Sequence, residues 1–134
     1  MYRVSTQASF DAAHFLKDYP GKCHNLHGHR WKVVIEVSSP ELDEGSMVID
    51  FTDIKKELKK MADHFDHCLI IEEGSLKKET YEALVSEDFR IVTVNFRPTA
   101  ECFAKYFFDQ LSSSFPVNKV QVYETPNNVA TYEV

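Results

Sequence analysis

The 134-residue sequence has few cysteines, no long apolar run and no excess of positive charge. Its three cysteines, Cys23, Cys68 and Cys102, are odd in number and widely spaced, which argues against a disulfide framework. No stretch approaches the roughly 18 apolar residues of a membrane-spanning helix, and the first residues lack the apolar segment of a signal peptide. We therefore expect a soluble cytoplasmic protein with no membrane partner.

Acidic residues outnumber basic ones, with 21 Asp and Glu against 15 Lys and Arg and a formal net charge of -6. Proteins that bind nucleic acid usually carry a basic excess or a basic stripe, because they neutralise phosphates. Neither is present, so nucleic acid is not an expected partner. The sequence is 43% hydrophobic and 13% aromatic, which is too apolar for a disordered chain. We expect one domain, spanning residues 1–134.

Periodic patterns predict the secondary structure. Alternation of apolar and polar residues predicts strands at 2–10, 30–37, 118–124 and 129–134. Helical spacing predicts one helix that starts near Asp50 or Thr52 and another that Thr99 caps. Between the helices we expect a short helix near 76–85 and a short strand near 90–95. This order predicts an α+β domain, with two helices on one face of a four-stranded antiparallel sheet whose edges self-association would cover.

Three histidines give the clearest chemical signal. His27 and His29 are two residues apart, so on a strand both side chains leave the same face as Trp31. Histidines on a buried face are costly unless their nitrogens are satisfied, and a metal ion would satisfy them. His14, at the end of the first strand, could be a third ligand, which would leave zinc an open position typical of catalytic sites. Histidines with a purely structural role are the alternative.

Cys23 precedes His27 by four residues, and this spacing fits several roles. As a fourth zinc ligand, Cys23 would close the site and make it structural. As a thiolate beside the ion, it could act as a general base or nucleophile. It could also be a loop cysteine without a role.

Two further places carry side chains suited to chemistry. Asp66 and His67, at the end of the first predicted helix, could orient an imidazole and move a proton, or could be two solvated residues. Glu124 shares the strand face of Val120 and Val122, so its carboxylate needs a donor-rich partner. A ligand with a guanidine-like edge would provide two parallel hydrogen bonds. A glutamate turned to solvent is the alternative.

Short motifs occur in a fixed order along the chain: Phe10-Asp11-Ala12-Ala13-His14, Cys23-x3-His27-Gly28-His29, Val48-Ile49-Asp50-Phe51, Asp66-His67, Pro98-Thr99-Ala100-Glu101 and Val122-Tyr123-Glu124-Thr125. Through them the chain resembles the family of 6-pyruvoyl- and 6-carboxy-tetrahydropterin synthases. The resemblance implies a tunnelling fold, a four-stranded antiparallel sheet with two helices on one face. It also implies a homo-oligomer, a hexamer being favoured, in which subunits join edge to edge into barrels and sites lie between subunits.

The resemblance implies roles for the residues singled out above. It implies zinc ligation by His14, His27 and His29, general-base catalysis by Cys23, a second acid/base relay in Asp66 and His67, anchoring of the pterin edge by Glu124, and lining of the same pocket by Thr99 and Glu101. Lys17, Lys22, Arg30 and Arg97 are candidate partners for phosphate groups. Phe65 and Ile71 depart from the Leu and Asn common in the family, next to Asp66-His67.

The implied substrate is 7,8-dihydroneopterin triphosphate. The three residues between Cys23 and His27 resemble the 6-carboxy branch, which serves queuosine (7-deazaguanine) biosynthesis, whereas the pyruvoyl branch of biopterin synthesis typically has a longer gap. The implied reaction is zinc-dependent and releases acetaldehyde and triphosphate, leaving 6-carboxy-5,6,7,8-tetrahydropterin. The alternatives are the triphosphate-eliminating pyruvoyl lyase, a non-catalytic zinc-stabilised pterin-binding protein, and a cysteine hydrolase.

Overall fold

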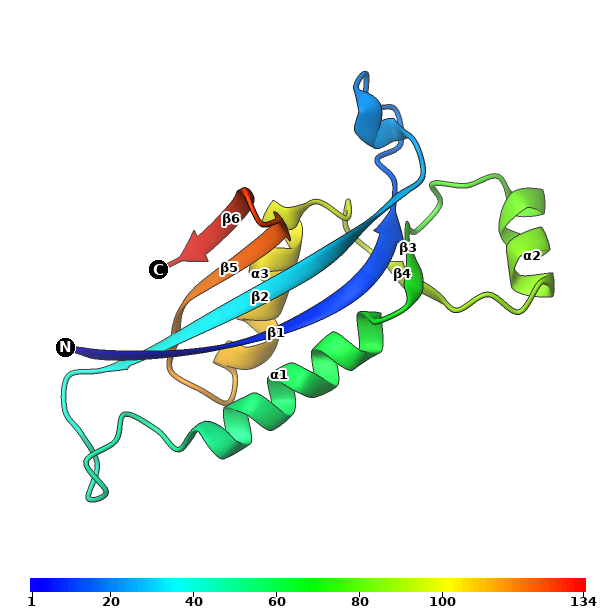
Figure 1. The fold of residues 1–134 in the computed structure, drawn as a ribbon. Coiled ribbons are helices and arrows are strands. Elements are labelled where there is room, and N and C mark those ends of the chain that lie inside the picture. The colour runs from blue at the N-terminus through cyan, green and yellow to red at the C-terminus, as the bar shows by residue number, and fades with distance from the viewer.

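A long antiparallel hairpin of two 13-residue strands, β1 (Tyr2–His14) and β2 (His27–Ser39), forms the centre of the computed structural model, which describes residues 1–134 (Figure 1). Its register runs unbroken from the Tyr2–Ser39 pair to the His14–His27 pair. Both predicted strands are confirmed, but they are longer than the sequence pattern indicated. The extension matters because it places His14, His27 and His29 inside regular strands rather than in the connecting loop.

Four more strands complete a six-stranded sheet in the order β4-β3-β1-β2-β5-β6. On one side, β5 (Val117–Thr125) pairs antiparallel with β2, and β6 (Asn128–Glu133) pairs antiparallel with β5. On the other side, β3 (Cys68–Glu72) pairs parallel with β1, and β4 (Ile91–Val94) pairs parallel with β3.

The expected sheet of four antiparallel strands was therefore wrong in number and in kind, because the sheet is mixed and has six strands. The strand missing from the prediction is β3, which contains the apolar run Leu69-Ile70-Ile71. A parallel strand covered on both faces shows no apolar–polar alternation, so its sequence does not distinguish it from a buried loop or helix segment.

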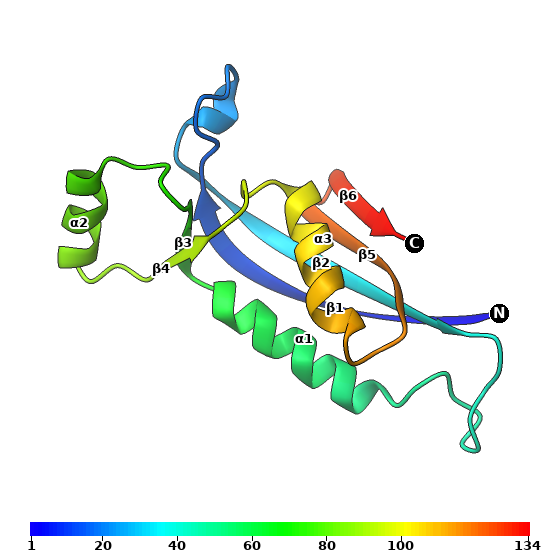
Figure 2. The same ribbon diagram turned by 180° about the vertical axis from the view of Figure 1, so that it is seen from behind.

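Two helices, α1 (Phe51–Phe65) and α3 (Ala100–Ser112), cover the same face of the sheet, as predicted (Figure 2). Each begins at a side chain that accepts a free backbone N–H of the first turn. Asp50 Oδ1 accepts from Thr52 N at 2.8 Å, and Thr99 Oγ1 accepts from Cys102 N at 3.2 Å. The short helix α2 (Lys78–Ser86) connects β3 to β4, has no buried residue and stands apart from the other helices in both views.

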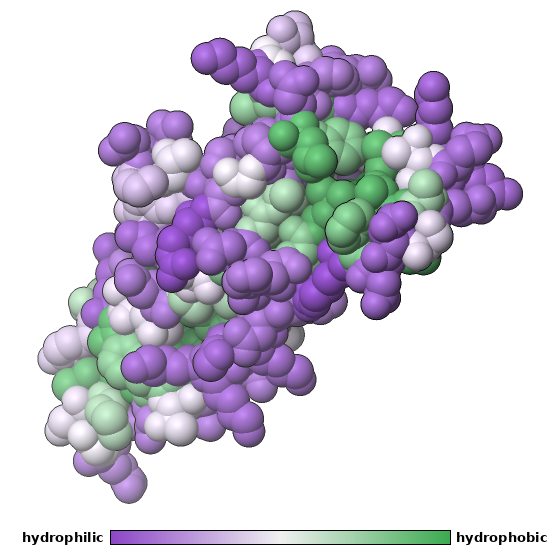
Figure 3. All heavy atoms as spheres, turned by 45° about the vertical axis from the view of Figure 1, so that its right-hand side comes forward, coloured by the Kyte–Doolittle hydropathy of each residue, from purple (hydrophilic) through white to green (hydrophobic).

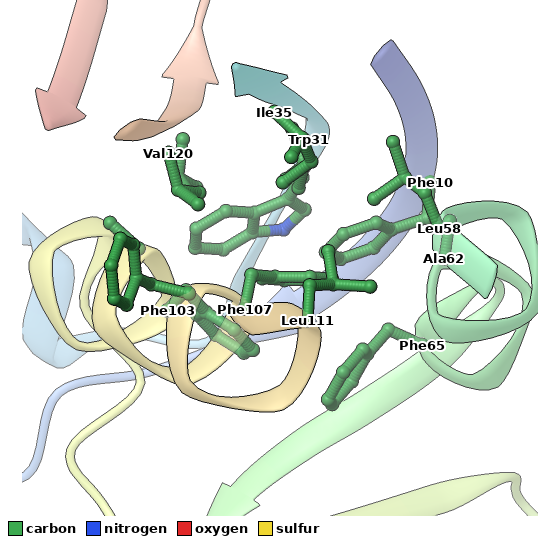
Figure 4. Close-up of a cluster of buried hydrophobic side chains, with 14 of the residues drawn as sticks. Phe10, Trp31, Ile35, Leu58, Ala62, Phe65, Phe103, Phe107, Leu111 and Val120 are labelled. Atoms are coloured by element: carbon green, nitrogen blue, oxygen red, sulfur yellow. The ribbon is translucent and has the colours of Figure 1, made fainter. Parts of the chain in front are cut away.

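The apolar core lies between the hairpin and these two helices, and aromatic rings dominate it (Figure 4). Phe10 stacks on Trp31 with ring centroids 6.0 Å apart, and Trp31 packs on Phe103 at 5.3 Å. Burying each such ring contributes about 1.5–3 kcal/mol, so this cluster anchors the hairpin to α3. The edge of Trp31 also meets His14, with centroids 4.9 Å apart. The rigid core therefore continues directly into the histidines.

No helix of the chain is both long and apolar enough to cross a membrane. All three cysteines are free thiols, in agreement with the expectation of no disulfide framework.

Candidate metal centre and catalytic turn

The three histidines meet at the end of the β1–β2 hairpin, on the face that the helices cover. His14 lies directly opposite His27 in the strand register, and His29 lies opposite the small residue Ala12. The three imidazole centroids are 4.6 to 5.3 Å apart. His14 is only 1% exposed, whereas the other two are half-buried. The strand pairing alone thus brings together the side chains that the sequence pattern put on one face.

Backbone carbonyl groups fix the protonation of two of these rings. His14 Nδ1 lies 2.7 Å from Pro98 O, and His27 Nδ1 lies 2.6 Å from Asn25 O. A carbonyl oxygen only accepts, so each Nδ1 carries the proton and each Nε2 offers a lone pair. These two Nε2 atoms are 3.0 Å apart. Two lone pairs that face each other at this distance repel unless a cation lies between them, which is what a metal ligand pair requires.

Glu124 adds a carboxylate to the same point. Its Oε1 lies 2.8 Å from His29 Nε2 and 3.5 Å from His14 Nε2. Although the first contact is short, its angle is not that of a hydrogen bond, and His29 Nε2 is buried without a hydrogen-bond partner. The ligand atoms of His14, His27, His29 and Glu124 all lie within 4.8 Å of one another. The residues present therefore fit a bound cation.

The electrostatics of the cluster agree with this fit. A hydrogen bond from His14 in its doubly protonated form, followed by the positive charges of the other histidines, lowers the pKa of the Glu124 carboxyl despite its partial burial. The group is therefore an anion at neutral pH. Burial lowers the pKa of His29, so its imidazole is neutral. Neutral imidazoles and an ionised carboxylate form a ligand set that zinc and several other divalent ions accept.

Cys23 lies outside this set. It sits in the short 3-10 helix η1 (Lys22–His24) of the loop between β1 and β2 and is half-buried. Its backbone carbonyl accepts from Leu16 N at 2.8 Å, which ties the loop to the end of β1. Its sulfur is not among the atoms that cluster with the three histidines. The structure thus gives no support to Cys23 as a closing metal ligand, and its role as a base stays a prediction.

Asp66 and His67 form a second polar group, at the point where α1 ends. Asp66 Oδ2 lies 2.8 Å from His67 Nδ1, and Asp66 Oδ1 accepts from Asp11 N at 2.9 Å. The N–H of His67 in turn donates to Asp11 O at 2.6 Å. The hydrogen bond from the Asp11 N–H, followed by that from His67, lowers the pKa of Asp66. The ionised carboxylate therefore orients an imidazole whose other nitrogen is left to exchange a proton.

The two groups lie on opposite faces of β1. Strand alternation sends the Asp11 side chain away from the face that holds His14, and Asp66 and His67 lie with Asp11. Beside His67 is a cavity of about 670 Å³ between the hairpin end, β3 and the α2 region. Its apolar wall includes Leu84 and Phe89, and apolar surface gathers on this side of the molecule (Figure 3). His29 also lines this cavity, but its ligand atom belongs to the separate cluster with His14, His27 and Glu124.

The remaining predicted residues occupy different surroundings. Thr99 caps α3 and adjoins Pro98, whose carbonyl holds His14, whereas Glu101 is exposed in the first turn of the helix. Among the candidate cations, Arg30 pairs with Asp11 at 3.1 Å and Arg97 donates to Lys17 O at 2.9 Å. The sequence did not indicate the two carbonyl groups that orient the histidines. Every residue has a backbone carbonyl group, so residue types do not show which of them accepts a hydrogen bond from a histidine.

The fold and site together define a class of protein: an α+β domain in which three histidines of the central hairpin and a glutamate of β5 form a cluster that could hold a metal ion. Residues 3–134 match the family model described as 6-pyruvoyl tetrahydropterin synthase, and the chain belongs to this family. The resemblance seen in the sequence motifs is thereby confirmed.

Relatives and solved structures agree with this assignment. The chain is 34% identical to the 6-carboxy-5,6,7,8-tetrahydropterin synthase of Haemophilus influenzae, over 99% of each chain. It is 36% identical to the protein of the same name from Aquifex aeolicus, over 90% of this chain and 82% of that one.

The 6-pyruvoyl tetrahydropterin synthase of Caenorhabditis elegans superposes with a TM-score of 0.73 at 27% identity, over 99% of this chain and 95% of that one. An uncharacterised protein of Wolinella succinogenes shares the fold, with a TM-score of 0.83 at 23% identity over 98% and 97% of the two chains.

Proposed function

We propose that this chain is a single-domain, zinc-dependent lyase that converts 7,8-dihydroneopterin 3'-triphosphate to 6-carboxy-5,6,7,8-tetrahydropterin, with release of acetaldehyde and triphosphate. The observation that carries the proposal is a preorganised cation site in a chain that matches synthases of this name along its whole length. The reaction would belong to queuosine (7-deazaguanine) biosynthesis, in the cytoplasm.

The metal ligands proposed are His14, His27 and His29. Each of the first two donates its Nδ1 proton to a backbone carbonyl, so both present Nε2 without further rearrangement. Zinc suits three neutral imidazoles that leave an open position. A bound zinc ion supplies Lewis acidity, which lowers the pKa of a coordinated substrate hydroxyl group.

Two proton-transferring groups are proposed from this chain. Cys23, on the loop that adjoins the hairpin end, is the general base. His67 is the second acid/base group, because Asp66 fixes its Nδ1 and leaves the imidazole 78% exposed for exchange with substrate.

Glu124 is proposed to anchor the amino-pyrimidinone edge of the pterin, with Thr99 and Glu101 lining the same pocket. Its carboxylate is ionised and 25% exposed, so it can accept two parallel hydrogen bonds from such an edge. The geometry also supports Glu124 as a fourth metal ligand when no substrate is bound, because its Oε1 already lies among the imidazole nitrogens.

We further propose that the complete site forms between two copies of the chain in a homo-oligomer, with a hexamer favoured. Asp66 and His67 form a cluster with Asp11 that is separate from the three histidines and Glu124, and this separation supports a site that a second chain completes. The outer strands β4 and β6 leave two sheet edges at which copies of the chain can pair.

The second candidate function is the triphosphate-eliminating 6-pyruvoyl-tetrahydropterin synthase, which the family description and the fold of the Caenorhabditis elegans enzyme favour. The deciding experiment incubates zinc-loaded protein with 7,8-dihydroneopterin triphosphate, identifies the pterin by mass spectrometry and assays acetaldehyde. Carboxy-tetrahydropterin with acetaldehyde supports the first proposal. Pyruvoyl-tetrahydropterin without acetaldehyde supports the second candidate. Tight pterin binding without turnover, at full metal content, supports a binding protein instead.

A further inference from the structure

Arg90 lies in the connection between α2 and β4, yet its guanidinium group reaches the end of α1. Its Nη1 donates to Asp66 O at 3.1 Å, and its Nη2 donates to His64 O at 2.6 Å and to Asp63 O at 3.4 Å. Its own carbonyl accepts from Leu69 N at 3.0 Å, which ties the backbone of Arg90 to β3. One side chain thus donates hydrogen bonds to three carbonyl groups at the end of a helix that lies far away in the sequence.

These carbonyl groups need such a partner. The last carbonyls of an α-helix have no partner within the helix, and together they carry partial negative charge. A guanidinium group meets both needs, because it is always positive and presents its N–H groups in a rigid fork. Arg90 therefore complements the partial negative charge at the end of α1 and ties Asp66, the residue after the helix, to the connection before β4.

The Asp66-His67 turn comes directly after this helix end. His67 has a φ of 55°, a left-handed conformation that side chains with a Cβ rarely adopt. Asp11 holds the turn from the β1 side through both its N–H and its carbonyl group. Arg90 holds the same turn from the opposite side through Asp66 O. The strained turn is thus clamped between β1 and the β3–β4 connection, which lie beside the end of α1 (Figure 2).

We propose that Arg90 is a positioning residue for catalysis, which sets the orientation of the Asp66-His67 pair by clamping the carboxyl end of α1. This inference rests on the proposed function, in which His67 transfers a proton. It also gives a structural role to the segment that contains α2, although this helix has no buried residue. That segment delivers Arg90, which lines the same cavity as His67, to the helix end.

The test compares two variants of Arg90 with a matched control in the zinc-loaded, full-length protein. Arg90→Met removes the fork and its charge. Arg90→Lys keeps the charge but replaces the fork with a single ammonium group. Arg3→Met is the control, because Arg3 is an exposed arginine of β1 whose partner is Glu36. Each protein is assayed for kcat, KM, zinc content and melting temperature, and the imidazole signals of 13C-labelled histidine are followed by NMR.

We expect both Arg90 variants to lower kcat on the order of 10- to 100-fold, as misplacement of a catalytic group by about an ångström does. KM and zinc content should stay close to wild type. The His67 imidazole signals, assigned with His67→Ala, should shift or broaden, while those of His14, His27 and His29 stay unchanged. Arg3→Met should match the wild type in every measurement.

The proposal is overturned if the Arg90 variants keep the wild-type kcat and His67 signals. It is also overturned if kcat falls only in proportion to the folded fraction, or if both variants fail to fold, since Arg90 would then support the domain as a whole. If the wild type itself shows no turnover at full zinc content, the proposed function fails. The NMR comparison would in that case still decide whether Arg90 orients His67.

Discussion

The metal centre and the Asp66-His67 turn are built in different ways. The candidate ligands of the metal centre, His14, His27, His29 and Glu124, project from the paired strands β1, β2 and β5, and the register of these strands places them on one face. His67 instead follows the last turn of α1, is 78% exposed and is oriented by the hydrogen bonds that it donates to the Asp66 carboxylate and to the Asp11 carbonyl group. One group owes its geometry to sheet pairing, and the other to a few contacts between distant segments.

This difference has a mechanical consequence. The backbone positions of the three histidines are fixed by the register of a hairpin that the aromatic core around Trp31 holds in place. Moving His67 requires only the loss of a backbone hydrogen bond or of the Arg90 clamp. The cluster of His14, His27, His29 and Glu124 is thus the rigid half of the candidate site, and the Asp66-His67 turn is its adjustable half. An adjustable half suits the proposed site between two chains, because it has to fit the surface of another copy.

The largest effect is expected at the rigid half. His27→Ala removes one imidazole and exposes the lone pair of His14 Nε2, so zinc binding and turnover should both be lost. The loss of zinc affinity should exceed the roughly 10- to 100-fold change caused by loss of a residue outside the ligand set. His24→Ala is the control, because His24 is exposed in the adjoining loop. Zinc measured by mass spectrometry at wild-type levels in His27→Ala would exclude this histidine as a ligand.

The second prediction tests whether the two halves come from different chains. His67→Ala should keep zinc and lose about 100- to 10,000-fold in rate, as removal of a general acid or base does. When it is co-expressed with His27→Ala and the hybrid oligomers are purified through two tags, activity should reappear. Independent pairing of intact halves predicts about a quarter of the wild-type rate. Hybrids that stay as inactive as their parents would show that each chain uses its own His67.

The third prediction concerns Glu124, which contacts His29 and also lines a cavity of about 370 Å³ together with Arg30 and Tyr123. Glu124→Gln keeps the shape of the side chain and removes its charge. If Glu124 anchors the pterin, kcat/KM should fall about 10- to 100-fold, which is the value of one charge-assisted hydrogen bond, while zinc stays bound. Glu133→Gln, an exposed position on β6, is the control. A parallel loss of zinc affinity would assign Glu124 to the metal instead.

The two halves also differ in how far the sequence predicts them. The clustering of His27 and His29 followed from their spacing, because strand alternation acts locally and needs no knowledge of the tertiary fold. The strand face on which Glu124 lies was predicted in the same way, because Glu124 alternates in phase with Val120 and Val122. Its approach to the histidine nitrogens, in contrast, depends on which strand pairs with β2. The caps of α1 and α3 were likewise local, and both are confirmed.

The contacts around His67 are non-local and could not be predicted in this way. The partners of the turn, Asp11 and Arg90, lie far away along the chain in either direction, and the contacts run largely through backbone atoms. The strand β3 was not predicted because its pairing with β1 is also non-local. This pairing depends on a parallel crossover, which residue patterns do not encode. Residue types therefore indicated Asp66 and His67, whereas only the fold shows what holds them.

The smallest expected effect is a pH-dependent change in stability at the adjustable half. The Asp11 N–H, and after it His67, lowers the pKa of Asp66 in the folded protein relative to the unfolded chain. A depressed carboxyl pKa stabilises the fold at pH values above the unfolded pKa of about 4, and this contribution disappears as the pH falls through the folded pKa. Asp66→Asn should therefore melt slightly below wild type at pH 7, and the two melting temperatures should converge at acidic pH below about 4.

Melting curves recorded from pH 7 down to pH 3 provide the measurement. Asp18→Asn serves as the control, because Asp18 is an exposed carboxylate of the β1–β2 loop. The effect is small because the Asp66 carboxylate is open to solvent screening, and its size is less informative than its direction. A difference between Asp66→Asn and wild type that persists unchanged at pH 3 would show that shape rather than charge holds the turn. The clamp on His67 would then depend on Arg90 and the backbone of Asp11 alone.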